Sequence, residues 1–151
     1  MSSVTTFLWF ESAAEQAGEF YASVVPNSRV VEISRNDDGS AFVVSLDLDG
    51  QSVTLMNGGP GHPLTDAASL QIVVDTQEEV DRLWDALTEG GAPGPCGWLT
   101  DRYGLSWQVV PSVLIELMGG PDPARTIAVG TALRTMSKLD AGALQDAYDH
   151  A

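Results

Sequence analysis

The stretch that decides the fold is Leu70-Gln71-Ile72-Val73-Val74-Asp75-Thr76-Gln77-Glu78, with apolar residues following at Val80, Leu83, Trp84 and Leu87. Its first five residues have the composition of a β-strand. The next four are typical of a helix N-cap and its partner. The later apolar residues recur at the spacing of one helix face, which ends at Gly90-Gly91. The sequence therefore predicts a strand followed directly by an amphipathic helix.

The same order of signals occurs 63 residues earlier. Phe7-Leu8-Trp9-Phe10 is a short strand-like run, and Ser12-Ala13-Ala14-Glu15 has the form of a capping box. A helix face then follows at Ala13, Ala17, Phe20 and Val24. In this register Ala17 corresponds to Val80, and Tyr21 corresponds to Trp84. Such internal similarity predicts two structural modules built on one plan.

Both halves also end alike, with hairpin-forming segments after the helix. The expected strands cover residues 29–35, 41–48 and 51–56 in the first half, and 92–93, 96–100 and 105–110 in the second. Each half is thus β-α-β-β-β. Hairpin turns such as Asp49-Gly50 favour mixed sheets over a parallel doubly wound sheet, so the expected fold class is α+β.

The expected domain covers residues 1–120, with module one at about 4–57, a linker at 58–67 and module two at about 68–111. A helical extension follows over residues 121–151. Asp122-Pro123 and Asp140 are suitable starts for its helices. This extension packs either on the core or on a second subunit, and the pattern does not distinguish the two.

Charge and composition exclude several classes of protein. Seven Lys and Arg residues against 21 Asp and Glu give a formal charge of −14, with an isoelectric point near 4.1. Such a surface repels phosphate backbones and anionic lipids, so neither nucleic acid nor a membrane is expected as a partner. No apolar run has the length of a membrane span, and Met1-Ser2-Ser3-Val4 lacks the charged start of a signal peptide. The single cysteine, Cys96, excludes an internal disulfide and is typical of the cytoplasm.

Four segments, spread over roughly Val4 to Leu117, carry a family resemblance: Phe7-Leu8-Trp9-Phe10, Phe20-Tyr21-Ala22-Ser23-Val24-Val25-Pro26-Asn27-Ser28-Arg29, Leu55-Met56-Asn57-Gly58-Gly59-Pro60 and Cys96-Gly97-Trp98-Leu99-Thr100-Asp101-Arg102-Tyr103-Gly104-Leu105-Ser106-Trp107-Gln108. Together they resemble the vicinal oxygen chelate superfamily, the glyoxalase and bleomycin resistance fold, and within it the PhnB-like branch. The resemblance implies two curved mixed sheets around a concave pocket, and a homodimer. Members of this branch often carry the name demethylubiquinone methyltransferase. A methyl donor such as S-adenosylmethionine usually lies at a glycine-rich strand-to-helix turn, and neither Glu11-Ser12-Ala13-Ala14 nor Asp75-Thr76-Gln77-Glu78 contains glycine.

Alternation along the strands separates a helix-covered face from a concave one. The helix-covered face is expected to carry the apolar residues that share one parity along each strand, among them Phe7, Trp9, Leu55, Ile72 and Trp107. The opposite face mixes apolar and uncharged polar residues, which is typical of a ligand pocket, although a wetter second core or a dimer face has the same pattern. Trp98, on a short strand beside the last hairpin, could stack on an aromatic ligand or pack at a subunit contact. The candidate ligand-binding residues are Thr6, Leu8, Phe10, Thr54, Met56, Ser69, Gln71, Trp98, Ser106 and Gln108.

Metal-using members of the superfamily place His, Glu or Gln on the first and last strands of each half. Those positions correspond here to Thr6, Thr54, Ser69 and Gln108. Hydroxyl groups and one amide bind divalent transition metals poorly. We therefore expect no metal and no other cofactor.

No titratable side chain is expected on the concave face, so the sequence identifies no catalytic residue. His62 and His150 lack ligand-spaced partners, and the Asn57–Gly61 stretch reads as a flexible connection that could act as a lid. Asp101 and Arg102 are expected to form a turn with a local ion pair. The sequence favours a PhnB-like protein that binds or sequesters a small molecule. The alternatives are an enzyme acting on a small molecule, including the methyltransferase of the family name, and a pure interaction module.

Overall fold

The computed structural model describes residues 3–151, and the chain divides into two compact units between Leu64 and Thr65. Met1 and Ser2 belong to the expected first domain and to the N-terminus that lacks the charged start of a signal peptide, and they lie outside the described residues. No helix within residues 3–151 is long and apolar enough to cross a membrane.

The first unit is a four-stranded mixed sheet with one helix. Its strand order is β1-β4-β3-β2, with β1 parallel to β4 and the other pairs antiparallel. Its elements are β1 (Thr6–Phe10), α1 (Ala14–Val24), β2 (Ser28–Arg35), β3 (Ala41–Leu48) and β4 (Gln51–Asn57).

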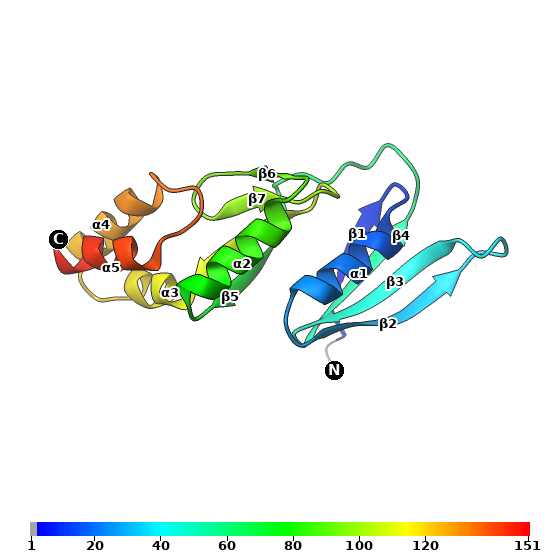
Figure 1. Ribbon diagram of the computed structural model, residues 1–151, viewed down its shortest axis with the longest axis horizontal. Coiled ribbons are helices and arrows are strands. Elements are labelled where there is room, and N and C mark those ends of the chain that lie inside the picture. The colour runs from blue at the N-terminus through cyan, green and yellow to red at the C-terminus, as the bar shows by residue number, and fades with distance from the viewer. Residues whose placement is uncertain (1–2) are drawn as a thin grey trace. The chain divides into compact units, whose positions relative to one another are not determined.

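The second unit repeats this plan and adds three helices (Figure 1). Its sheet has the order β5-β8-β7-β6, with β5 parallel to β8. Its elements are β5 (Ser69–Val74), α2 (Gln77–Thr88), β6 (Ala92–Pro93), β7 (Trp98–Thr100), β8 (Ser106–Pro111), α3 (Ser112–Met118), α4 (Pro123–Leu133) and α5 (Ala141–Asp149). The expected α+β class with two mixed sheets is confirmed.

Helix α1 packs closely on its sheet because Gly18 faces it. A Cβ placed on Gly18 would lie 2.9 Å from Cγ1 of Val44 and 3.2 Å from Cδ2 of Leu46. Ala17, Tyr21 and Val24 are buried on the same helix. The absence of a side chain at one position therefore brings the helix axis close to β3.

The expected capping box at the start of α1 is wrong. The N-cap residue is Ala13, which makes no side-chain cap. The amide of Ala14 instead donates a 2.8 Å hydrogen bond to Oδ1 of Asn57, at the end of β4. Glu15 forms an ion pair with Arg35 on β2. A residue more than forty positions away in sequence thus replaces the local cap.

Helix α2 forms where it is expected, but its N-cap is Thr76, one residue after Asp75, the first residue of the expected capping motif. The Thr76 side chain accepts a 3.2 Å hydrogen bond from the amide of Glu79, as an N-cap does. Val80, Leu83, Trp84 and Leu87 are all buried.

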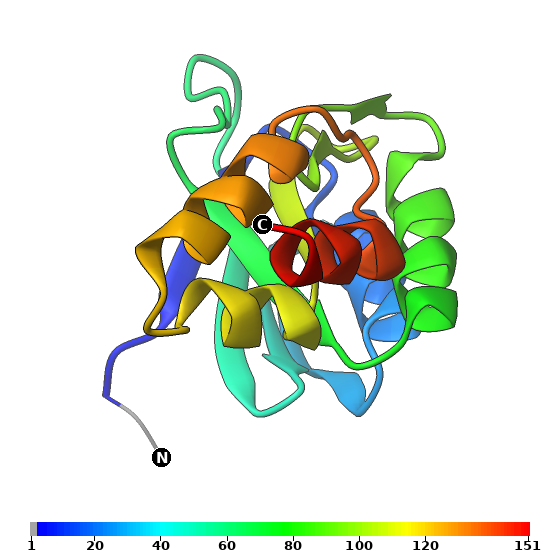
Figure 2. The same cartoon turned by 90° about the vertical axis from the view of Figure 1, so that its left-hand side faces the viewer.

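The C-terminal extension packs on the second unit of its own chain. It begins with α3 at Ser112, earlier than the expected residue 121, and Figure 2 shows its three helices grouped together. Asp122 and Asp140 cap α4 and α5 as expected. Its buried residues form one cluster with the end of β8: Val110, Leu114, Leu117, Val129, Leu139 and Leu144.

Candidate ligand-binding site

Five of the expected site residues share one face of the second sheet. Gln71 lies opposite Gln108 and Ser69 lies opposite Ser106 across the β5–β8 pair. Trp98 lies opposite Gln108 across β7 and β8. Directly opposed residues point to the same side of a sheet, so the predicted face of this module is confirmed. Leu70, Ile72, Trp107 and Val109 lie on the other face, as expected.

Uncharged hydrogen-bonding groups are linked along this face. Nε2 of Gln71 donates to Oε1 of Gln108 at 3.4 Å, and Nε2 of Gln108 donates to Oγ of Ser69 at 3.0 Å. Gln71 is exposed and Gln108 is half-buried. This row of hydrogen-bonded side chains places amide and hydroxyl groups on the sheet face and carries no fixed charge.

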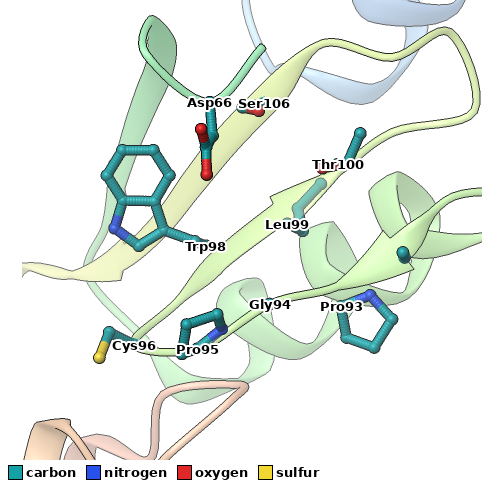
Figure 3. Close-up of a pocket in the computed structure, with 10 residues that line it drawn as sticks. Asp66, Pro93, Gly94, Pro95, Cys96, Trp98, Leu99, Thr100 and Ser106 are labelled. Atoms are coloured by element: carbon teal, nitrogen blue, oxygen red, sulfur yellow. The ribbon is translucent and has the colours of Figure 1, made fainter.

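A pocket of about 430 Å³ opens beside these residues (Figure 3). Trp98 and Ser106 come from the expected set, and the remaining lining residues were missed. The carboxylate of Asp66 points into the pocket beside the indole of Trp98, while Cys96 and Pro95 lie at the opposite end. The full lining is Asp66, Ala92, Pro93, Gly94, Pro95, Cys96, Trp98, Leu99, Thr100 and Ser106. A mainly apolar wall with a few polar groups is typical of a small-molecule site.

The Gly94–Gly97 wall of the pocket is held by the C-terminal extension. The amide of Cys96 donates a 2.8 Å hydrogen bond to the carbonyl oxygen of Met136, and the amide of Gly97 donates one of 2.8 Å to the carbonyl oxygen of Ser137. Oγ of Ser137 donates to the carbonyl of Gly94 at 2.6 Å. Cys96 and Gly97 both have positive φ values, 60° and 84°, a conformation that an alternating strand pattern cannot predict. The extension therefore sets the shape of this wall.

On the first sheet, the expected face of β1 is wrong. Thr6, Leu8 and Phe10 lie opposite Val53, Leu55 and Asn57, on the side covered by α1. Leu8 and Phe10 are accordingly buried, at 8% and 4% exposure, which prevents both side chains from lining an open face. The hydroxyl of Thr6 accepts a 3.1 Å hydrogen bond from Nε2 of Gln51.

Phe7 and Trp9 occupy the open face instead, with the expected residues Thr54 and Met56. The parallel register puts Phe7 opposite Thr54 and Trp9 opposite Met56. Four consecutive apolar residues in β1 contain no alternation, so only the pairing with β4 decides which side each occupies. Phe7 is 56% exposed. Module one thus offers an aromatic face where a partly polar one was expected.

The Gly/Pro-rich stretch after β4 lies over Trp9. Nε1 of Trp9 donates a 2.9 Å hydrogen bond to the carbonyl of Gly59, and the ring centroids of Trp9 and His62 are 4.2 Å apart. A Cβ on Gly58 would clash with the indole ring. Glycine is therefore required where this segment crosses the ring.

The positions compared with metal ligands do not form one set on the first sheet, because Thr6 and Thr54 point to opposite faces. Within residues 3–151, no three His, Cys, Asp or Glu side chains are grouped closely enough to hold a metal ion. The expectation of no titratable side chain concerns the concave face of the strands. The pocket of the second unit is lined by two such side chains from irregular segments, Asp66 and Cys96, which that expectation does not cover. Asp66 falls within the expected linker over residues 58–67, and no local sequence pattern links it to β7.

Comparison with known proteins shows which family this chain resembles. Residues 2–110 match the profile of the family described as 3-demethylubiquinone-9 3-methyltransferase. A solved structure named as a putative 3-demethylubiquinone-9 3-methyltransferase, PhnB protein, from Bacillus cereus is 34% identical, with a TM-score of 0.66 over 73% of this chain and 99% of that chain. Protein PA1353 from Pseudomonas aeruginosa is 19% identical, with a TM-score of 0.61 over 74% of this chain and 98% of that one.

The fosfomycin resistance protein FosX from Listeria monocytogenes is 11% identical, with a TM-score of 0.52 over 74% of this chain and 93% of that one, and shares the fold. No curated protein of known function is similar enough to count as a relative. The profile match and the Bacillus cereus structure show that this chain belongs to the PhnB-like family described as 3-demethylubiquinone-9 3-methyltransferase.

Proposed function

We propose that this protein binds, and thereby sequesters, a small, partly apolar molecule in the pocket of its second unit. The observation that carries the proposal is the pocket of about 430 Å³ lined by Trp98 and Ser106. These two residues belong to the sheet face that also carries Ser69, Gln71 and Gln108. An indole supplies a flat apolar surface, and amide groups supply directional hydrogen bonds. Together they suit a ligand with an aromatic or aliphatic body and a polar substituent.

The single cysteine gives a direct test of this site. Cys96 lines the pocket, so a bound molecule should slow its alkylation by N-ethylmaleimide. We expect millimolar tryptophol (indole-3-ethanol) to protect Cys96, and Trp98→Ala to abolish the protection. Ile127→Ala removes an exposed apolar side chain outside the pocket and should leave protection intact. Equal alkylation rates with and without the probe would contradict the proposal.

We also propose that the site works without a metal. Its neutral amide and hydroxyl groups bind transition metals weakly, which supports this proposal. Protein purified without added ions should contain less than stoichiometric metal by atomic absorption. One metal ion per chain, lost together with ligand protection on treatment with a chelator, would overturn it.

An enzyme is the second candidate, because the family description and the Bacillus cereus relative both name a methyltransferase. The turns from β1 into α1 and from β5 into α2 contain no glycine that would admit a nucleotide-like methyl donor. Asp66 and Cys96 nevertheless supply titratable groups in the pocket. Calorimetry with S-adenosylmethionine separates the candidates: micromolar binding followed by methyl transfer would favour the enzyme.

The homodimer implied by the family is likewise a proposal. It is supported by the exposed apolar side chains of Phe7 and Val73, which are 56% and 44% exposed. Sedimentation velocity should give twice the chain mass of 16.0 kDa. A single species of monomer mass at high micromolar concentration would contradict the dimer.

A further inference from the structure

We propose that the ligand of this pocket carries a positively charged amine or quaternary ammonium group on an aromatic or aliphatic body. The inference rests on the proposed function and names the ligand class of the same site. It is carried by the placement of one carboxylate beside one indole in a pocket without any basic side chain.

The charge of the lining has one sign. Asp66 is its only carboxylate, and none of the other nine lining residues is Lys, Arg or His. Among the described residues, ion pairs of this unit join Arg102 to Glu89, Arg125 to Asp122 and Lys138 to Asp81. Asp66 takes part in none of these pairs, and its residue is exposed, so its carboxylate is accessible to a ligand cation.

Trp98 adds a second attraction for the same kind of charge. The face of an indole ring carries negative electrostatic potential and attracts ammonium groups within about 6 Å of its centre. Asp66 and Trp98 line the same pocket, and Figure 3 shows the Asp66 carboxylate and the Trp98 indole both projecting from the chain over β7. An ammonium group seated here contacts the ring and the carboxylate together, while its carbon body lies along Pro93, Pro95 and Leu99.

The field of the whole protein favours the same ligand class. A formal charge of −14 raises the local concentration of cations and lowers that of anions around the pocket mouth. A carboxylate or phosphate ligand would meet Asp66 with no cation to offset the repulsion. A neutral ligand would leave the carboxylate unused, so binding of neutral molecules is the competing outcome that the experiment must measure.

The test uses three indoles of similar size on the full-length protein: cationic tryptamine, neutral tryptophol and anionic indole-3-propionate. Their dissociation constants are measured by calorimetry at low and physiological salt, and protection of Cys96 from alkylation places each in the pocket. We expect tryptamine to bind about ten-fold more tightly than tryptophol, from one exposed ion pair plus one cation–indole contact. Indole-3-propionate should bind most weakly.

Variants separate the local carboxylate from the general charge. Asp66→Asn should weaken tryptamine binding about five- to ten-fold and change tryptophol binding by less than about two-fold. Asp75→Asn removes the same charge from an exposed residue of this unit that does not line the pocket, and it should leave the preference for tryptamine intact.

The outcomes distinguish the two proposals. If none of the three indoles protects Cys96, or if Trp98→Ala changes nothing, the pocket is not the binding site and the proposed function fails. If all three protect Cys96 with equal affinity, or if the anion binds most tightly, the pocket stands and the cationic ligand class is overturned. An equal loss of tryptamine affinity in Asp66→Asn and Asp75→Asn would assign the preference to net charge and would also overturn the role of Asp66.

Discussion

Asp101 is a buried carboxylate that organises the turn before β8. It is 3% exposed and accepts hydrogen bonds from the amides of Tyr103 and Leu105, at 2.8 and 3.1 Å, and from Nε1 of Trp107 at 2.9 Å. Among the described residues, Asp101 does not form the expected ion pair with Arg102. Arg102 pairs with Glu89 instead. Both carboxylate oxygens are thus used by donors within the turn and on the neighbouring strand.

Replacing this carboxylate should be costly. Asp101→Ala leaves the buried indole N–H of Trp107 and two amides without their acceptor, so we expect a loss of about 2–4 kcal/mol in the free energy of unfolding. Urea denaturation followed by far-ultraviolet circular dichroism measures it. Asp75→Ala, at an exposed position of the same unit, is the control and should change stability by less than about 0.5 kcal/mol. If Asp101→Ala left the free energy of unfolding unchanged, the result would show that water replaces the carboxylate as acceptor.

Glu15 gives a pH-dependent contribution to the first unit. Two hydrogen bonds from Arg35, at 2.7 and 3.2 Å, lower the pKa of Glu15, with the charge of Arg35 acting in the same direction. Because the pKa is lower in the folded chain, this contribution is complete above the ordinary glutamate pKa and is lost as the pH falls through the lowered value.

We therefore expect Glu15→Gln to be less stable than the native chain at pH 7, and the difference to shrink in acid. Urea midpoints at pH 7 and at about pH 3.5 measure this change, since an unperturbed glutamate titrates near 4.3. Glu32→Gln removes the same charge from an exposed residue of the same unit as a control for net charge. A difference that stays constant across the two pH values would contradict the assignment.

Helix α1 depends for its start on a strand residue. Asn57 accepts from the amide of Ala14 at 2.8 Å and donates to the carbonyl of Ala41 at 3.1 Å, so it links α1, β3 and β4. Asn57→Ala should lower the free energy of unfolding by about 1–2 kcal/mol, the usual cost of losing a helix cap. Ser12→Ala, at the position where the sequence predicts the cap, should be nearly neutral.

Thermal unfolding of both variants measures this contrast, and Asn57→Asp separates the two hydrogen bonds. Aspartate keeps the acceptor for Ala14 but cannot donate to Ala41, so it should recover part of the stability. Equal losses in Asn57→Ala and Ser12→Ala would indicate that the helix is capped locally after all.

The C-terminal extension acts on the pocket through one element, the segment between α4 and α5. The Gln77 side chain donates to the carbonyl of Leu139 at 2.9 Å and accepts from the amide of Ala141 at 2.8 Å. This anchors the segment whose carbonyl groups hold Cys96 and Gly97. Gln77→Ala should free the wall to open and raise the rate at which a disulfide reagent modifies Cys96 by about three-fold or more.

Gln145→Ala is the matched control, since among the described residues the side chain of that glutamine donates to Asp149 on α5 and not to the segment that holds the wall. It should react at the native rate. An unchanged rate in Gln77→Ala, with its stability also unchanged, would show that the wall keeps its shape without the extension.

The elements differ in how far their sequences predict them. Alternation of polar and apolar residues in β5 and β8 predicts which face is open, because each register shift would bury a polar side chain. The run Thr6–Phe10 contains no such signal, so its face depends on pairing with β4. Helix α3 follows β8 without a polar cap, since Pro111 holds the N-cap position, and its start is therefore not visible in the sequence.

At the scale of the molecule, the internal repeat predicts the architecture but not the pocket. The wall over residues 94–97 depends on positive φ values and on hydrogen bonds to residues 136 and 137, some forty positions away. Asp66 reaches the site from the segment before β5. Periodicity reports which side of a regular element is buried, whereas this pocket is built from irregular segments that meet only after folding.

The net charge should make stability and ligand binding depend on salt in opposite directions. With 21 acidic and seven basic side chains, mutual repulsion destabilises the folded chain at low ionic strength. Raising sodium chloride to about 0.15 M shortens the screening length to about 8 Å, which should raise the thermal midpoint by about 2–4 °C.

Over the same range the association rate of tryptamine should fall, because screening weakens its attraction to the negative chain, while that of tryptophol should not change. Differential scanning calorimetry and stopped-flow mixing measure the two effects. A midpoint that does not change with salt would show that the acidic residues are too far apart to repel one another. A midpoint that rises without levelling off at higher salt would indicate a general effect of chloride on burial rather than screening.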